Sequence, residues 1–189
     1  MYINLLNKLY YFCDHFNINE IDGIKKISII FNLQHKNSVN TFKIEKMIKY
    51  CKKFSIPYYF INNIKHCIKY KANGLYIESN YKNAILNRPS LKKFEILGSA
   101  HNQIEYYFKK KQFCSSIFLS PLFYNNKYSN YKILGISRFN LKSLYWKSSL
   151  IALGGINSTN FKKIILTRAR GIGFKRFISK LKNPTYQLK

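Results

Sequence analysis

The feature that most constrains the fold of this chain is a series of eight short apolar runs, separated by longer stretches punctuated with polar residues. Several runs are apolar at consecutive positions instead of alternating ones, which is typical of strands buried on both faces of a parallel sheet. The sequence therefore predicts eight parallel strands. Their residues are Leu9–Cys13, Ile27–Leu33, Tyr58–Asn62, Gly74–Ile77, Phe94–Ser99, Ser116–Ser120, Leu150–Gly154 and Gly171–Phe174.

The stretches between the runs are compatible with helices. Val39–Phe54 and Asn160–Arg168 place apolar residues near one face. Asn63–Lys71 and Asn102–Lys111 show the same pattern more weakly. Alternating strands and helices predict an α/β protein, either a closed TIM (β/α)8 barrel or a doubly wound open sheet. No G-x-G-x-x-G follows the first strand and no Walker A sequence is present, which favours the barrel.

The predicted barrel is compact. The chain has 189 residues, whereas barrels usually need about 200 or more. The short connection between Cys13 and Ile27 leaves room for a first helix of only a turn or two, around Asn19–Ile24, so we expect a shortened first β/α unit. No internal repeat or low-complexity linker divides the chain, and we expect a single domain over residues 1–189.

Cysteine usage and hydropathy point to the cytoplasm. Cys13, Cys51, Cys67 and Cys114 show no C-x-x-C spacing and no clustered histidines, so neither a zinc site nor a disulfide framework is indicated. No apolar run approaches the roughly 18 residues that span a bilayer. The N-terminal segment lacks a basic stretch before a smooth apolar one, so a cleaved signal peptide is not expected.

The net charge is +26, from 33 Lys and Arg against 7 Asp and Glu. Such a field attracts nucleic acid or an anionic membrane. Composition supplies a second explanation, because the favoured residues Lys, Ile, Asn, Tyr and Phe all have AT-rich codons and Val39 is the only valine. The lysines are spread along the whole chain, with only short clusters such as Lys109–Lys111. The charge alone does not separate a selected anion-binding surface from compositional drift.

Small and hydrogen-bonding residues gather after the predicted strands, where a barrel has its active site. The clearest group is the ALGGI run of Ala152–Ile156, followed by four polar residues and a predicted helix. Two glycines let the backbone approach a ligand, and a helix start presents unpaired N–H groups. Together with Gly171–Gly173, this run predicts a phosphate site at the last two strands.

These residues amount to a family resemblance. ILGSAHN (Ile96–Asn102), FLSPLF (Phe118–Phe123), the later Leu134-Gly135 pair, IALGGI (Ile151–Ile156) and GIGF (Gly171–Phe174) occur in the order and approximate spacing of the thiamine phosphate synthase/TenI superfamily. LYYFCD, PYYFINN and NGLYIE resemble its first, third and fourth strands, so the resemblance covers about residues 8–178. It implies a TIM barrel that joins hydroxymethylpyrimidine pyrophosphate to thiazole phosphate and releases pyrophosphate with help from Mg²⁺.

The resemblance also implies roles for individual residues. Backbone N–H groups of Gly154, Gly155 and Gly173 would hold the thiazole phosphate. Ser99 matches a serine that contacts the pyrophosphate, and Lys36 closes the Q-x-R-x-K motif on the second strand. Asn62 matches the asparagine of the N-D motif, and the other residues expected to bind substrate are Ser120 and Lys127, a lysine that replaces the lysine of the P-T-x-T-K loop in role and not in position.

Several family positions are changed in this chain. Gln34 replaces the arginine that would grip pyrophosphate, and Asn63 replaces one Mg²⁺-binding carboxylate. The second carboxylate is absent around Asn80 and Tyr81, which leaves Glu78 as a weak candidate metal ligand. Since Mg²⁺ prefers carboxylate or phosphate oxygens to amides, we expect Mg²⁺ binding to be possible but weakened.

Three interpretations follow. The first is a divergent thiamine phosphate synthase in which Lys36 and Lys127 make up for the lost groups. The second is a TenI-like protein that binds thiazole phosphate and performs proton transfer or no chemistry. His101 is then the candidate general acid/base, or else a loop histidine that caps the next helix. The third is a basic nucleic-acid or membrane-surface protein, which no nucleic-acid motif supports. The first two imply small-molecule phosphates as partners.

Overall fold

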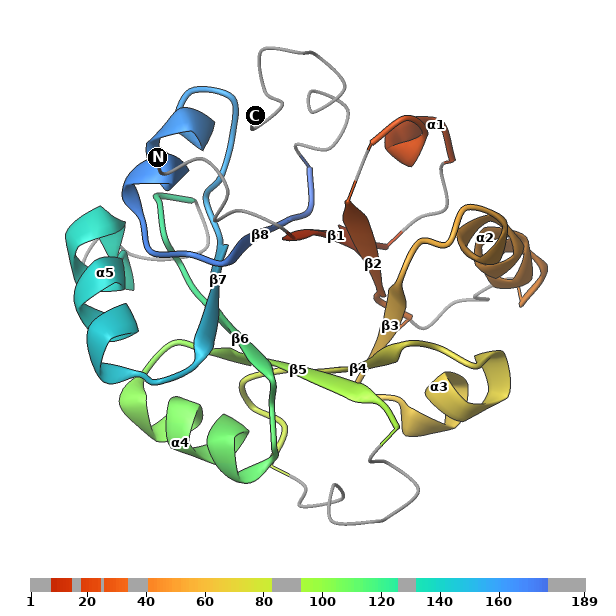
Figure 1. The fold of residues 1–189 in the computed structure, drawn as a ribbon, viewed down its shortest axis with the longest axis horizontal. Helices are drawn as coiled ribbons and strands as arrows, with labels where there is room; N and C mark the ends of the chain where they lie inside the picture. The colour runs from red at the N-terminus through yellow and green to blue at the C-terminus, as the bar shows by residue number, and fades with distance from the viewer. Residues whose placement is uncertain are drawn as a thin grey trace.

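The computed structural model describes residues 8–14, 18–24, 26–33, 41–82, 93–125 and 132–176. Each strand pairs in parallel with the next, and β8 pairs with β1, so the sheet closes into a barrel with helices around its outer face (Figure 1). The predicted TIM barrel is confirmed. The strands are β1 (Lys8–Cys13), β2 (Ile27–Phe31), β3 (Tyr58–Ile61), β4 (Gly74–Ile77), β5 (Glu95–Ala100), β6 (Ser116–Leu119), β7 (Ser149–Leu153) and β8 (Gly171–Phe174).

The helices follow the strands around the barrel. The first is a single turn, which agrees with the predicted shortening of the first unit. The helix predicted at Asn160–Arg168 is instead a six-residue 3₁₀ helix, and the sequence analysis did not anticipate α5. The helices are α1 (Ile18–Ile21), α2 (Thr41–Lys53), α3 (Ile64–Tyr70), α4 (Gln103–Lys111), α5 (Gly135–Tyr145) and the 3₁₀ helix η5 (Phe161–Leu166).

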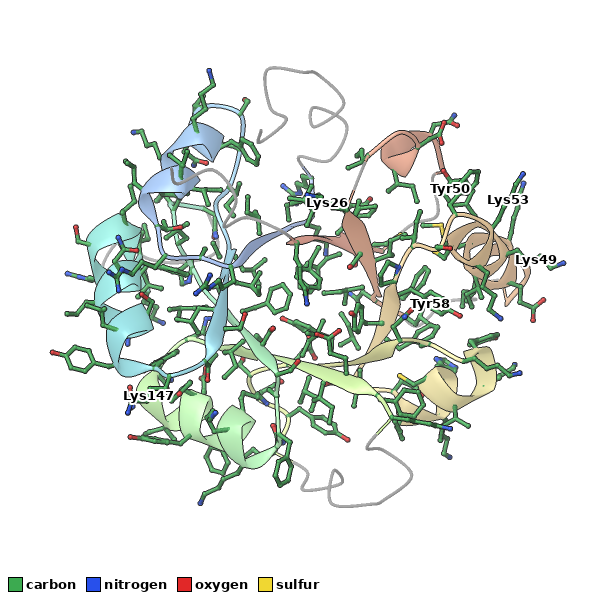
Figure 2. The ribbon with its side chains drawn as sticks, viewed as in Figure 1. Lys26, Lys49, Tyr50, Lys53, Tyr58 and Lys147 are labelled. Carbon is green, nitrogen blue, oxygen red and sulfur yellow. The ribbon has the colours of Figure 1, made fainter. Side chains whose placement is uncertain are left out.

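Aromatic side chains fill the interior of the barrel (Figure 2). The ring centroids of Tyr10 and Phe118 lie 5.0 Å apart, and those of Tyr76 and Phe118 lie 5.2 Å apart, both in edge-to-face geometry. Space for these rings comes from β8, because a Cβ atom added to Gly173 would lie 2.9 Å from the Phe118 ring. Gly173 is therefore required for packing, besides its predicted part in the phosphate site.

Glu95 closes the N-terminal end of the barrel. Its carboxylate accepts a hydrogen bond of 2.6 Å from the Tyr59 hydroxyl and lies 3.7 Å from the Lys8 ammonium group. The nearby Tyr10 hydroxyl is buried and has no hydrogen-bond partner within the described ranges. Burial first, and then the charge of Glu95, raise the pKa of Tyr10. This end is filled, so a substrate site belongs to the opposite end.

None of the helices in the described part of the chain is long and apolar enough to cross a membrane. The four cysteines Cys13, Cys51, Cys67 and Cys114 are all buried free thiols. Burial raises the pKa of Cys51, Cys67 and Cys114 to about 12. These three thiols therefore stay protonated, and the Cys67 thiol donates to the Gly74 carbonyl at 3.2 Å.

Candidate active site

The predicted site residues that the structure describes lie on the C-terminal side of the barrel. Because all eight strands run parallel, the residues at their C-terminal ends share one rim. Lys36 and Lys127 lie outside the described residues. The residues on the rim are Asn62, Glu78, Ser99, His101, Ser120, Gly154, Gly155 and Gly173, which come from β3 to β8 or directly follow them.

A cavity of about 600 Å³ opens between the ends of β6, β7 and β8. Four predicted site residues line it: Ser120, Gly154, Gly155 and Gly173. The other described candidates, Asn62, Glu78, Ser99 and His101, are not part of its wall and belong to the β3–β5 side of the rim. The structure thus brings the predicted thiazole-phosphate residues together in one cavity.

The loop after β7 holds its shape through its two glycines. Gly154 has φ +90° and Gly155 has φ +72°, in the left-handed region that favours glycine. A Cβ atom on Gly155 would lie 2.2 Å from the Phe123 carbonyl oxygen, so only glycine fits there. The Asn160 side-chain amide donates to the Gly155 carbonyl at 2.8 Å, and the Phe123 N–H donates to the Gly154 carbonyl at 3.0 Å. The loop is therefore fixed in place.

The predicted N–H donors at the start of the following helix are already used. The Asn157 side-chain oxygen accepts hydrogen bonds from the N–H groups of Thr159 (2.9 Å) and Asn160 (3.2 Å). The glycine loop is different, since within the described ranges the N–H groups of Gly155 and Ile156 have no hydrogen-bond acceptor. The donors available to an anion in this cavity are therefore in the glycine loop itself.

Lys175 and Arg176 also line the cavity, and the sequence analysis missed them. They directly follow β8, as the glycine pair follows β7. The Lys175 ammonium group forms an ion pair with the Asp14 carboxylate, which also accepts a hydrogen bond of 2.8 Å from the Asn32 side chain. The available signal was two basic residues directly after a predicted strand of the phosphate site. It was hidden by the abundance of lysine throughout the chain.

Asn62 and Glu78 hold each other at the ends of β3 and β4. Asn62, with φ +49°, donates from its side-chain amide to Glu78 Oε2 at 2.7 Å and accepts from the Glu78 N–H at 3.0 Å. Asn63 caps α3, because its side-chain oxygen accepts a hydrogen bond from the His66 N–H at 3.0 Å. The Asn63 amide, at the position where the family resemblance implies a carboxylate, thus caps the N-terminus of α3.

These described residues are a poor fit for a magnesium ion. The Glu78 carboxylate is engaged by Asn62, the Asn63 oxygen caps α3, and an amide is a poor substitute for a carboxylate toward Mg²⁺. Within the described ranges, no group of three or more His, Cys, Asp or Glu side chains is arranged to hold a metal ion.

His101 is held against the loop after β6. Its Nδ1 atom lies 2.8 Å from the Ser120 carbonyl oxygen and 3.1 Å from the Ser120 hydroxyl. A carbonyl oxygen only accepts, so Nδ1 carries the proton and the neutral ring has its basic lone pair on Nε2. Asn102, and not His101, caps the next helix, because its side-chain oxygen accepts from the Glu105 N–H at 2.9 Å. Since Ser120 lines the cavity, His101 lies next to its wall.

A buried lysine supports the loop that follows β4. The Lys109 side chain is fully buried, and its ammonium group donates to the Tyr81 carbonyl at 2.9 Å and to the Gln112 side-chain oxygen at 3.0 Å. Burial is the main cause of its lowered pKa. A Cβ atom on Gly98 would lie 3.0 Å from the Lys109 chain, so this glycine makes room for it. The lysine fixes the segment that begins at Glu78 against α4.

The closed parallel barrel defines the class of this protein as a TIM barrel, and its candidate site is the glycine-walled cavity at the ends of β7 and β8. Residues 29–178 match the family described as thiamine monophosphate synthase, so the chain belongs to this family. The predicted resemblance is confirmed. A thiamine-phosphate synthase of Flavobacterium psychrophilum is 25% identical over 170 residues, which cover 86% of this chain and 82% of the relative.

Solved structures show the same fold. A thiamine phosphate pyrophosphorylase from Pyrococcus furiosus superposes with a TM-score of 0.75 at 15% identity, covering 95% of this chain and 93% of that one. A thiamine phosphate pyrophosphorylase from Bacteroides thetaiotaomicron gives a TM-score of 0.58 at 14% identity, covering 90% and 83% of the two chains. At these identities the likeness establishes the fold alone.

Proposed function

We propose that this protein is a divergent thiamine phosphate synthase, which joins hydroxymethylpyrimidine pyrophosphate to thiazole phosphate and releases pyrophosphate. The observation that carries the proposal is the cavity of about 600 Å³ walled by Gly154, Gly155 and Gly173, in a chain of this family. We expect the protein to act in the cytoplasm, because its four cysteines are free thiols.

The described residues suggest how the substrates would be held. The phosphate of thiazole phosphate would accept from the N–H groups of Gly155 and Ile156 in the glycine loop that lines the cavity. Ser99 lies buried at the end of β5, where the family resemblance implies contact with pyrophosphate. Bringing the two substrates together in this fixed geometry is itself a large part of the rate enhancement.

The reaction also requires that the negative charge on the leaving pyrophosphate be stabilised. Departing pyrophosphate carries about three negative charges, and stabilising such charge is usually the largest catalytic contribution. Because the described residues at this rim are a poor fit for a magnesium ion, the chain's own cations would neutralise this charge, with Lys36 and Lys127 as the sequence candidates. We therefore expect slow turnover that depends more on lysines than on a tightly held metal.

A second candidate function is that of a TenI-like protein acting on thiazole phosphate alone. The observation that favours it is the arrangement of His101, whose Nδ1 is fixed by the Ser120 carbonyl at 2.8 Å beside the cavity wall. This bond sets the tautomer in which Nε2 is basic, as a general base requires. Proton transfer on thiazole phosphate needs neither residues that bind pyrophosphate nor carboxylates that bind a metal ion.

The test is product formation by the purified chain. The protein is incubated with both substrates, with Mg²⁺ or with a chelator, and thiamine phosphate and pyrophosphate are quantified. The proposal predicts slow formation of both products in equal amounts, abolished in a Ser99→Ala variant that keeps its fold. No product, together with binding of thiazole phosphate, would support the TenI-like function. His101→Gln would then remove any proton exchange on the thiazole without weakening its binding.

A further inference from the structure

The cavity at the ends of β7 and β8 is lined by two basic residues as well as by its glycine loop. Lys175 and Arg176 follow β8, line the cavity, and are exposed to solvent. None of the described residues that line this cavity is acidic. The lining of this cavity therefore offers an anion two cationic side chains and the glycine loop, where the N–H groups of Gly155 and Ile156 have no acceptor among the described residues.

The two cations have different surroundings. Lys175 is paired with Asp14, whose side chain is only 15% exposed while that of Lys175 is 48% exposed. Asp14 is not part of the cavity wall and keeps Asn32 as a second partner. The Lys175 end of the pair is half exposed and screened by solvent, and Asp14 keeps the Asn32 hydrogen bond when Lys175 leaves, which lowers the cost of the exchange. Arg176 offers a planar fork of N–H donors that matches phosphate oxygens.

We propose that Lys175 and Arg176 bind the phosphate group of the substrate in this cavity, and that Lys175 leaves Asp14 for a phosphate oxygen when the ligand enters. The ligand class is a phosphomonoester dianion, because two cations with no carboxylate in the wall select double negative charge. Its identity as thiazole phosphate rests on the proposed function. The two residues add side-chain charge to a site that the glycine loop supplies only with backbone donors.

The first experiment measures the affinity for inorganic phosphate by titration calorimetry at constant ionic strength. Lys175→Met and Arg176→Gln should each weaken binding by about tenfold or more, the loss expected for a charge-assisted contact. Lys147→Met is the matched control, since it removes one positive charge from an exposed lysine beyond α5, at the periphery of the molecule (Figure 2). It should change the affinity by less than about twofold.

The second experiment tests the exchange of Asp14. Asp14→Asn removes the competing carboxylate but keeps an oxygen that accepts from Asn32, so phosphate binding should tighten by about threefold or more. Glu45→Gln, an exposed position on α2, makes the same change in net charge and is the control. Melting curves of all variants confirm that each is folded before its affinity is interpreted.

The outcomes separate this inference from the proposed function. Equal phosphate affinities in Arg176→Gln, Lys175→Met and Lys147→Met, or no binding by the unmodified chain, would overturn the anion site. An Asp14→Asn effect no larger than that of Glu45→Gln would overturn the exchange. If the affinities change as expected but no thiamine phosphate forms, the proposed function fails and this inference stands. If product forms while KM for thiazole phosphate is unchanged in Arg176→Gln, the proposed function stands and this inference fails.

Discussion

Asn62 and Glu78 exchange two hydrogen bonds across the ends of β3 and β4, one from the Asn62 amide to Glu78 Oε2 (2.7 Å) and one from the Glu78 N–H to Asn62 Oδ1 (3.0 Å). The carboxylate that the family resemblance offers as a metal ligand therefore also serves as part of the rim's framework. A hydrogen bond from Asn62 needs only an oxygen at Glu78, whereas a metal ion needs its negative charge, so a Glu78→Gln substitution separates the two roles.

Replacing Glu78 should cost less activity than replacing Lys36. In Glu78→Gln an amide oxygen still accepts from Asn62, so we expect product formation to fall by less than about threefold. Lys36→Ala removes a cation expected to stabilise the leaving pyrophosphate, so we expect a loss of about tenfold or more. Initial rates of thiamine phosphate formation at saturating substrates provide the comparison. A rate that is indifferent to Lys36 but collapses in Glu78→Gln would show that the site is misplaced.

Restoring a carboxylate after β3 should increase the dependence on Mg²⁺. The substitution Asn63→Asp should leave the cap of α3 in place, because aspartate and asparagine cap helices about equally well. The added charge near Glu78 supplies the hard oxygen ligand that Mg²⁺ prefers. Rates measured over a Mg²⁺ titration should show a stronger response in this variant than in the unmodified chain. The same titration curve for both proteins would contradict this account.

Much of the fold could be predicted from the sequence because buried parallel strands leave consecutive apolar runs, as in β2 and β6, which are buried throughout. Helix α5 could not be predicted, since Leu141, Leu144 and Tyr145 point their apolar side chains to solvent and Phe139 is its buried residue. Its pattern of apolar residues therefore does not mark the face that packs on the barrel.

The part of the site that is formed by backbone groups could be predicted. Gly154 and Gly155 directly follow a predicted strand, and this position identifies them as a ligand-binding loop. The site was not predictable where lysines and arginines act, because in a chain of net charge +26 no single one stands out. Lys175 at the cavity and the fully buried Lys109 are both cases. Only their surroundings, the cavity for Lys175 and the Tyr81 carbonyl for Lys109, distinguish them from the solvated lysines.

Gly173→Ala should destabilise the barrel from within. Its Cβ atom would lie 2.9 Å from the Phe118 ring and 3.0 Å from Leu153 in a filled interior. Overpacking of this kind costs about 1–3 kcal/mol of unfolding free energy. Gly23→Ala is the control, since its Cβ atom meets nothing within 4 Å and only its positive φ of +78° opposes the change. Urea unfolding of the two variants should show the larger loss in Gly173→Ala; equal losses would contradict the packing argument.

His66 should make stability fall as the solution is acidified. Burial, and then the charge of Lys69, lower the pKa of His66 below its ordinary 6.5, and its buried Nδ1 has no hydrogen-bond partner in the described residues. The unfolded chain therefore binds a proton that the folded chain resists, so this contribution is present above pH 6.5 and is lost as the pH falls through that value.

His66→Phe isolates this contribution, because a phenyl ring keeps the contacts with Phe60 and Tyr70, whose centroids lie 5.5 and 5.8 Å from that of His66. Unfolding free energies of both proteins are measured at about pH 8 and about pH 5.5. The unmodified chain should lose more stability than the variant over this interval. An identical loss in both would show that His66 protonates as easily in the folded state as in the unfolded one.

The central claim is that the cavity at the ends of β7 and β8 binds the phosphate of the substrate, which both candidate functions require. A crystal structure of the protein with thiazole phosphate tests it most directly. The account predicts a phosphate group within hydrogen-bonding distance of the N–H groups of Gly155 and Ile156, with Lys175 turned from Asp14 toward it. Thiazole phosphate bound away from this loop, or Lys175 still paired with Asp14 beside a bound phosphate, would contradict the account.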